Sequence, residues 1–183
     1  AVAAGDVLIS EFRTRGVNGA QDEYVEIANQ TSADIVVAAE DGSQGWSIGI
    51  APGVRAVVVP NGTVIPKGGH WLAATGFFSL SDYGSPDLVY SGDQNLQVDL
   101  PDDRGLALFN TATPAQYPFA LRLDAVGTVI ETDPLFYEGT PDPLPANDTR
   151  LVEVVEAGPA NPSYQTAWVR RTSSSGALLD TGN

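Results

Sequence analysis

The chain has 183 residues, of which nine are basic and 23 acidic, so its formal net charge at pH 7 is -14. That charge repels phosphate backbones and anionic membrane surfaces, which makes general nucleic-acid binding an unfavoured function. The absence of cysteine excludes disulfides, thiolate metal sites and a cysteine nucleophile. No apolar run approaches the roughly 20 residues needed to span a bilayer, so no membrane insertion is expected.

The first four residues, Ala1 to Ala4, are small and include no methionine. Small residues of this kind often surround the cut site of a signal peptidase. On this ground we expect a secreted or cell-surface location, although a cloning boundary would explain the same four residues.

Two β-type runs near the start of the chain, Val7 to Arg13 and Glu23 to Asn29, flank a loop rich in glycine and asparagine. Apolar residues alternate with polar ones in the second run, so one of its faces is a core face. Glycine and asparagine tolerate positive φ, which allows the two runs to be antiparallel neighbours. This pairing would bring Glu11 and Glu26 close together.

Further short β-type runs follow, separated by turns that draw on 13 prolines and 19 glycines. The predicted runs are Asp34 to Glu40, Gly45 to Ile50, Val54 to Val59, Thr63 to Ile65, His70 to Ala74, Leu88 to Tyr90, Leu106 to Phe109, Leu121 to Val126, Val129 to Glu131 and Ala167 to Thr172. We expect Pro60-Asn61-Gly62 to close one hairpin and Gly127-Thr128 to close another. Helices are expected to be scarce.

Two long connections interrupt this pattern. The segment from Gly76 to Asp103 is loop-like around one brief run, and such a long connection is often functional. The segment from Asp133 to Pro162 contains six prolines, which deny a central strand its hydrogen-bond donors. We interpret it as a surface excursion, with Leu151 to Val155 as a brief edge strand.

Many short strands, little helix and three separated tryptophans predict an all-β fold, an immunoglobulin-like β-sandwich with long irregular loops. A barrel is the second choice. We expect one domain over residues 1–183, with its core at about 7–132 and the excursion plus a last strand at 133–183.

A series of short motifs carries a resemblance to a known family. In order, they are Leu8-Ile9-Ser10-Glu11-Phe12, Asp22 to Asn29 (DEYVEIAN), Gly45-Trp46-Ser47-Ile48, Ile65-Pro66-Lys67-Gly68-Gly69, Gly105 to Phe109 and Asp124 to Gly127. Together they resemble a bacterial lamin-tail domain, and Asp180 to Asn183 is similar to the start of a motif at the end of such modules.

The resemblance implies an immunoglobulin-like sandwich without catalytic residues, found in exported bacterial proteins and sometimes beside nucleases or other hydrolases. Animal relatives bind chromatin or nuclear-envelope partners through basic surfaces. This chain departs from them because it is strongly acidic.

Three groups of residues are candidates for chemistry. Glu11 and Glu26 would form an acid/base pair only if they faced each other across a cleft. We favour a structural role, as strand residues that accept hydrogen bonds from loop amides or pair with Arg13 or Arg15. His70 is the only histidine, and no Gly-x-Ser-x-Gly turn accompanies it, so we expect an ordinary strand histidine. The five oxygen-bearing residues crowded into one loop, Asp93, Asn95, Asp99, Asp102 and Asp103, are candidate ligands for calcium, and no other cofactor is expected.

The three tryptophans, Trp46, Trp71 and Trp168, would stack on sugars if exposed, but their alternating apolar surroundings favour core positions. The function we expect is therefore a non-catalytic, secreted interaction or adhesion module of lamin-tail type, part of or accessory to an exported bacterial protein. Its partner would be a protein or a surface glycan. The alternatives are a carbohydrate-binding module, with or without the assistance of calcium, and an accessory domain of an extracellular hydrolase or nuclease.

Overall fold

The computed structural model describes residues 1–19, 21–90, 100–101, 104–114, 117–127, 131–138 and 167–180. These ranges hold the strands β1 (Val7–Arg13), β2 (Tyr24–Asn29), β3 (Ile35–Val36), β4 (Gly45–Ile50), β5 (Val54–Pro60), β6 (Val64–Ile65), β7 (His70–Thr75), β8 (Leu88–Tyr90), β9 (Leu106–Phe109), β10 (Arg122–Val126) and β11 (Trp168–Val169). The same ranges hold two short 3-10 helices, η2 (Phe119–Leu121) and η3 (Pro134–Phe136). No helix of this described part has the length and hydropathy of a membrane span.

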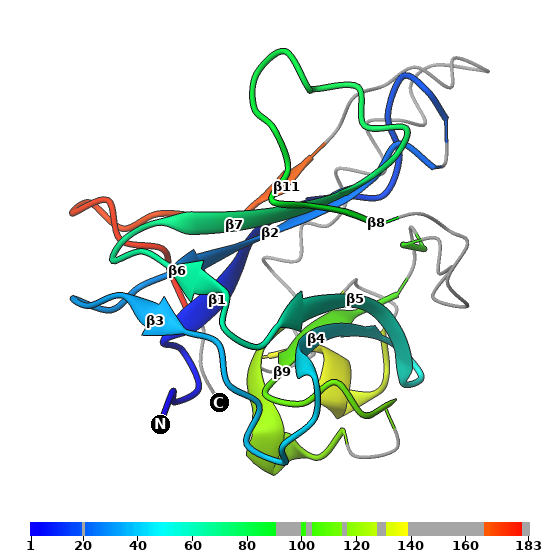
Figure 1. The fold of residues 1–183 in the computed structure, drawn as a ribbon. Coiled ribbons are helices and arrows are strands. Elements are labelled where there is room, and N and C mark those ends of the chain that lie inside the picture. Colours follow the sequence, from blue (N-terminus) through cyan, green and yellow to red (C-terminus); the bar gives the residue numbers. More distant parts are fainter. Residues whose placement is uncertain are drawn as a thin grey trace.

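The strands form two main sheets that lie one above the other (Figure 1). The five-stranded sheet has the order β11-β1-β2-β7-β8, and the four-stranded sheet has the order β10-β9-β4-β5. Strands β3 and β6 make a separate two-stranded ribbon. All pairings are antiparallel except that of β7 with β8.

Alternating apolar residues from both sheets meet in one core. The buried cluster includes Val25 and Ile27 of β2, Trp46, Ile48 and Ile50 of β4, Trp71 and Ala73 of β7, and Leu106 and Leu108 of β9. Period-2 alternation places such residues on the inner face of each sheet, where burial stabilises the fold. The predicted all-β sandwich is therefore confirmed.

The turn at Pro60-Asn61-Gly62 exists, but the hairpin predicted around it is wrong. Strand β5 pairs with β4, whereas β6 pairs with β3. The side-chain oxygen of Asn61 accepts from the Ala39 amide at 2.8 Å, and its side-chain nitrogen donates to the Ser43 carbonyl at 2.6 Å. These contacts fasten the turn to residues 39–43, so it carries the chain from one sheet to the ribbon.

The second predicted hairpin, at Gly127-Thr128, falls mostly on residues that the structure does not describe. Strand β10 pairs with β9, and Glu131 lies outside any strand, while residues 128–130 fall outside the described ranges. The register of β10 against β9 shifts between Arg122 and Asp124. Such a bulge re-aims side chains. Leu123 thus packs in the main core, while Ala125 packs in a second cluster on the other side of the sheet.

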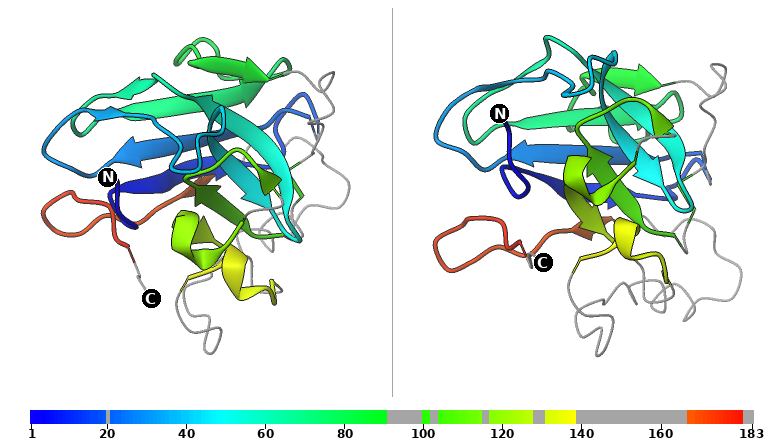
Figure 2. Two further views of the ribbon diagram at one scale, coloured as in Figure 1. Left: turned by 60° about the horizontal axis from the view of Figure 1, so that its bottom comes forward. Right: turned by 90° about the horizontal axis from the view of Figure 1, so that it is seen from below.

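That second cluster covers the outer side of the four-stranded sheet. Phe136 of η3, drawn yellow in Figure 2, meets Phe109 of β9 edge to face, with ring centroids 5.9 Å apart. Asp133 caps η3 by accepting from the Leu135 amide at 3.0 Å, and Pro134 starts the segment.

The C-terminal segment, drawn red in Figure 2, returns along the edge of the five-stranded sheet. Strand β11 pairs with β1, and Trp168 stacks on Phe12 with centroids 6.0 Å apart. The run expected at Leu151 to Val155 lies outside the described residues.

Candidate functional site

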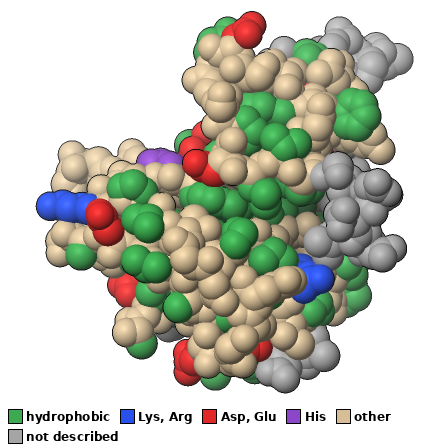
Figure 3. Space-filling view, viewed as in Figure 1, with side chains coloured by type: hydrophobic (Ala, Val, Ile, Leu, Met, Phe, Trp, Pro, Cys, Tyr) green, Lys and Arg blue, Asp and Glu red, His purple; other side chains and the backbone are tan. Residues whose placement is uncertain are grey.

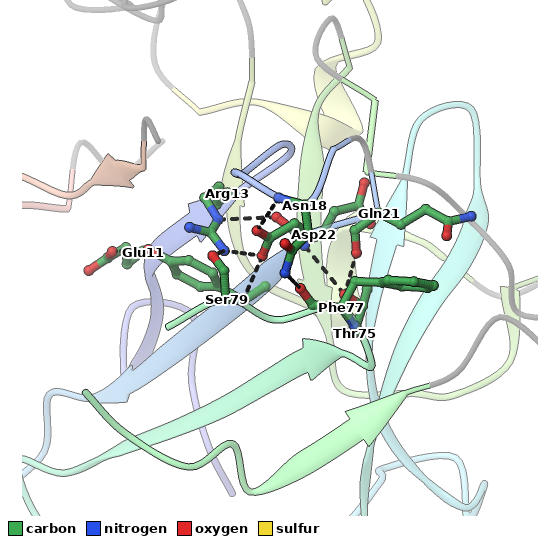
Figure 4. A network of polar contacts seen from close by, with 10 residues as sticks. Glu11, Arg13, Asn18, Gln21, Asp22, Thr75, Phe77 and Ser79 are labelled. Carbon is green, nitrogen blue, oxygen red and sulfur yellow. Dashed lines mark hydrogen bonds and ion pairs between the residues drawn. The ribbon is translucent and has the colours of Figure 1, made fainter. Parts of the chain in front are cut away.

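Arg13 and Asp22, at the two ends of the β1–β2 connection, form an ion pair in which the side chains are 1% and 0% exposed (Figure 4). The pair joins Arg13 Nη2 to Asp22 Oδ1, and Arg13 Nε also donates to the Asp22 carbonyl oxygen at 3.1 Å. Gly16 makes room for it, since a Cβ there would lie 2.3 Å from Asp22 Oδ2.

The ion pair ties together two loops that are far apart in the sequence. Asp22 accepts from the backbone amides of Asn18 at 3.1 Å and Ser79 at 3.0 Å. Arg13 Nη2 donates to Ser79 Oγ at 3.2 Å, and the Asn18 side chain donates to the Phe77 carbonyl at 2.8 Å. The β1–β2 and β7–β8 loops are thus held in one arrangement (Figure 4).

Aromatic contacts fix the β7–β8 loop over the outer face of the five-stranded sheet. The Arg13 guanidinium lies 5.1 Å from the Tyr24 ring and 6.0 Å from the Phe78 ring, and these two rings meet edge to face. The Tyr24 hydroxyl donates to Glu11. Burial, followed by this carboxylate, raises the pKa of Tyr24 far above its usual value, so the phenol stays protonated.

The two loops expose apolar side chains despite this internal order. Val17 is 43% exposed, Phe77 54% and Tyr83 89%. Figure 3 shows hydrophobic side chains in the upper part of the molecule, over the β7–β8 connection. We call Val17, Phe77 and Tyr83, with the two loops that carry them, the loop platform. Binding residues commonly sit on loops that a rigid scaffold positions.

Glu11 and Glu26 are neighbours across β1 and β2, as predicted, and each carboxylate has hydrogen-bond partners within the sheet. Glu11 accepts from Tyr24, while Glu26 Oε1 accepts from Ser10 Oγ at 2.6 Å and lies 2.7 Å from His70 Nδ1. These partners differ from the loop amides and arginines that we expected. Side-by-side positions on one sheet do not provide the two opposed carboxylates of a glycosidase.

Ser10, Glu26 and His70 also fail to form a nucleophilic triad. Glu26 lies between the serine and the histidine. Catalysis of that type needs the imidazole in the middle, where it takes the proton from the hydroxyl. The contact of His70 with Glu26 fits a strand histidine on the sheet surface, where its side chain is 51% exposed.

Trp46 and Trp71 pack in the core, as the sequence predicted. Trp46 is 0% and Trp71 5% exposed, and both belong to the main core. Trp168 is partly buried against Phe12. Neither Trp46 nor Trp71 is therefore available to a sugar.

The predicted calcium ligands, Asp93, Asn95, Asp99, Asp102 and Asp103, all lie outside the described residues. The described residues bring together a different set of acids. One carboxylate oxygen each from Asp124, Glu138 and Asp180 lie within 4.8 Å of one another. The sequence gives no local signal for this cluster, because Asp124 alternates with Arg122 on the expected polar face of the run Leu121 to Val126.

Burial and the repulsion between carboxylates raise the pKa of two members of this cluster, Asp124 and Glu138. Burial raises the pKa of Asp124 to about 6, against the opposing effect of Arg170. Burial, then the charge of Asp124 and a hydrogen bond with Asp180, raises the pKa of Glu138 to about 8. Like-charged carboxyls in a shared site behave in this way.

Comparison with known proteins assigns no family to the chain. It matches no protein-family model, and no curated protein matches it. The resemblance to the lamin-tail domain therefore stays a prediction, and the function has to be argued from the contacts above.

Proposed function

We propose that the chain is a non-catalytic interaction module of lamin-tail type, which acts outside the cell and binds a partner protein through the loop platform. The observation that carries this proposal is the buried Arg13–Asp22 ion pair, which holds together the two loops that carry the exposed side chains of the platform. The extracellular location follows from the resemblance to modules of exported bacterial proteins.

Rigid loops favour binding because little conformational freedom is lost when the partner arrives. Both loops of the platform are held rigidly, because the Asn18 amide of one loop and the Ser79 amide of the other donate to the Asp22 carboxylate. Exposed aromatic side chains supply large contact areas with few rotatable bonds, and they are enriched at the centres of protein interfaces. Phe77 and Tyr83 would serve as these anchors.

The charge of the chain indicates the chemistry of the partner. With a net charge of -14, the module attracts surfaces that carry lysine and arginine and repels acidic ones. Asp82 and Asp87 lie in the same β7–β8 connection as the two aromatic anchors. We infer a partner with an apolar pocket surrounded by basic residues, whose association slows as salt is added.

The contacts of the polar candidates support a non-catalytic role. Glu11, Glu26 and His70 are engaged with other side chains of the five-stranded sheet, and their arrangement lacks both the glycosidase and the triad geometry.

A carbohydrate ligand is the second candidate, because the Tyr83 ring is 89% exposed and an exposed aromatic face can stack on a sugar. Binding to an array of glycans, lost on Tyr83→Ser, would favour this alternative over a protein partner.

The test is selection of binders from a displayed library of folded protein domains, followed by affinity measurement with the purified chain. We expect the double variant Phe77→Ser, Tyr83→Ser to bind the selected domain at least about tenfold more weakly. The matched control is Val36→Ser, Val64→Ser, which removes two apolar residues that are 58% and 52% exposed on the β3–β6 ribbon. Equal loss in both double variants, or in neither, would contradict the proposal.

A further inference from the structure

Three carboxylates from distant parts of the chain meet at one edge of the sandwich. Asp124 comes from β10, Glu138 from the residues after η3, and Asp180 from the C-terminal segment. One oxygen of each lies within 4.8 Å of the other two, so the three are close enough to share one Ca²⁺ ion, whose oxygen ligands lie about 2.3–2.6 Å from it.

Two oxygens of the cluster lack a partner although they are buried. Asp124 Oδ1 and Glu138 Oε2 make no hydrogen bond within the described part of the chain. The side chain of Asp124 is 0% exposed and that of Glu138 is 8% exposed. A buried carboxylate oxygen without a partner is costly, and one explanation for such a group is a bound ion. This observation is independent of the clustering itself.

Two arginines fix the chain segments that carry Glu138 and Asp180. Arg122 Nη1 donates to the carbonyl oxygens of Pro134 at 2.9 Å and Tyr137 at 3.1 Å, which fixes the segment that ends at Glu138. Arg170 Nη1 donates to the Leu179 carbonyl at 3.1 Å, next to Asp180. The ligand-bearing segments are therefore positioned before any ion arrives.

The same arginines do not neutralise the three acids. Arg170 Nη2 lies 2.6 Å from Asp124 Oδ2, and Arg122 Nη2 lies 3.6 Å from Glu138 Oε1. Fully ionised, three carboxylates against two guanidinium groups leave one negative charge in a largely buried place. A cation bound between the three acids would offset that charge.

We propose that Asp124, Glu138 and Asp180 form a Ca²⁺ site that fastens the C-terminal segment to β10 and to the segment after η3. Hard oxygen ligands without histidine or cysteine are what Ca²⁺ takes, and water completes its shell of six to eight oxygens. Binding displaces protons from the carboxyls, because only the ionised forms coordinate the metal. The site is separate from the loop platform and does not depend on its function.

The test is calorimetric titration of the full chain with CaCl₂ near neutral pH. We expect one saturable site with a dissociation constant on the order of 10⁻⁴ M. Because Asp180 is exposed, Asp180→Asn removes a ligand without disturbing the core. Both this variant and Glu138→Gln should bind calcium at least about tenfold more weakly, whereas the control Asp82→Asn, an exposed acid in the β7–β8 connection, should bind as the parent does.

Two outcomes would overturn the proposal. One is the absence of saturable heat up to about 10 mM CaCl₂, beyond the range of weak extracellular calcium sites. The other is unchanged affinity in both Asp180→Asn and Glu138→Gln, which would place the ion elsewhere, as at the acids between Asp93 and Asp103. A rise in melting temperature with calcium in the parent, absent from Glu138→Gln, would confirm that the bound ion acts through this cluster.

Discussion

The Arg13 guanidinium pairs with the Asp22 carboxylate while neither side chain is more than 1% exposed. Removing two charges from water is expensive, and the attraction between them offsets that cost only when other hydrogen bonds assist. Backbone amides of Asn18 and Ser79 provide this assistance to Asp22. The pair therefore depends on the two loops, and the loops depend on the pair.

Breaking this pair should destabilise the fold strongly. Arg13→Ala leaves Asp22 as an uncompensated buried charge, so we expect a loss of about 3–5 kcal/mol in the free energy of unfolding, measured by urea denaturation. Arg171→Ala, at an exposed arginine, should change it by no more than about 0.5 kcal/mol. The double replacement Arg13→Met, Asp22→Leu should cost less than Arg13→Ala. If it costs more, the pair itself stabilises the fold beyond the value of apolar packing.

A substitution at Gly16, whose backbone lies against the Arg13–Asp22 ion pair, should also disturb this contact. A Cβ at this position would lie 2.3 Å from Asp22 Oδ2 and 2.8 Å from Arg13 Cζ, so the ion pair would have to move. We expect Gly16→Ala to lower the free energy of unfolding by about 1–3 kcal/mol. Gly76→Ala, where a Cβ meets nothing within 4 Å, should be neutral or slightly stabilising. Equal unfolding free energies for the two variants would mean that the loop adapts without strain.

Local patterns in the sequence predicted the strands better than their pairing. Strands β1, β4 and β9 begin and end at the predicted residues, because alternation and flanking turns are local signals. The hairpin at Pro60-Asn61-Gly62 failed because Asn61 bonds to residues about twenty positions earlier. A turn signal shows where the chain bends but not which strand lies beside the next one.

The candidate sites were hidden for a similar reason. Arg13 and Asp22 look like ordinary loop-flanking charges until Ser79, 57 residues beyond Asp22, is known to contact both of them. The density of acids between residues 93 and 103 directed attention to one loop. A buried carboxylate cluster instead needs acids from distant segments, such as Asp124 and Asp180, and burial of this kind is set by tertiary packing.

The core offers a direct test of the sandwich. Trp46 is 0% exposed, and its indole Nε1 donates to the Ala38 carbonyl at 3.2 Å. Trp46→Ala should therefore lower the free energy of unfolding by about 3–5 kcal/mol. Trp168→Ala, at the partly buried edge position that stacks on Phe12, should cost less than half as much. A larger loss at Trp168 in urea denaturation would show that the C-terminal edge, rather than the centre, limits stability.

The carboxylate cluster predicts how the stability of the metal-free protein depends on pH. The pKa of Glu138 is raised from 4.5 to about 8, so above its unfolded value the folded state holds a proton that the unfolded state has released. Stability from this group is complete below about pH 4.5 and is lost as the pH rises through about 8. Asp124, with a pKa raised from 3.8 to about 6, acts in the same direction over a lower range.

We therefore expect Glu138→Gln to flatten the decline in unfolding free energy between about pH 5 and pH 8, because glutamine has no proton to release. Urea denaturation of the parent and the variant at several pH values, with a calcium chelator present, measures the difference. Asp82→Asn is the control for removing a surface charge and should keep the parental slope. Titrating groups outside the carboxylate cluster contribute equally to all three proteins and cancel in the comparison. Parallel profiles for the parent and Glu138→Gln would mean that Glu138 is already ionised at neutral pH, and that the two arginines suffice to hold its charge.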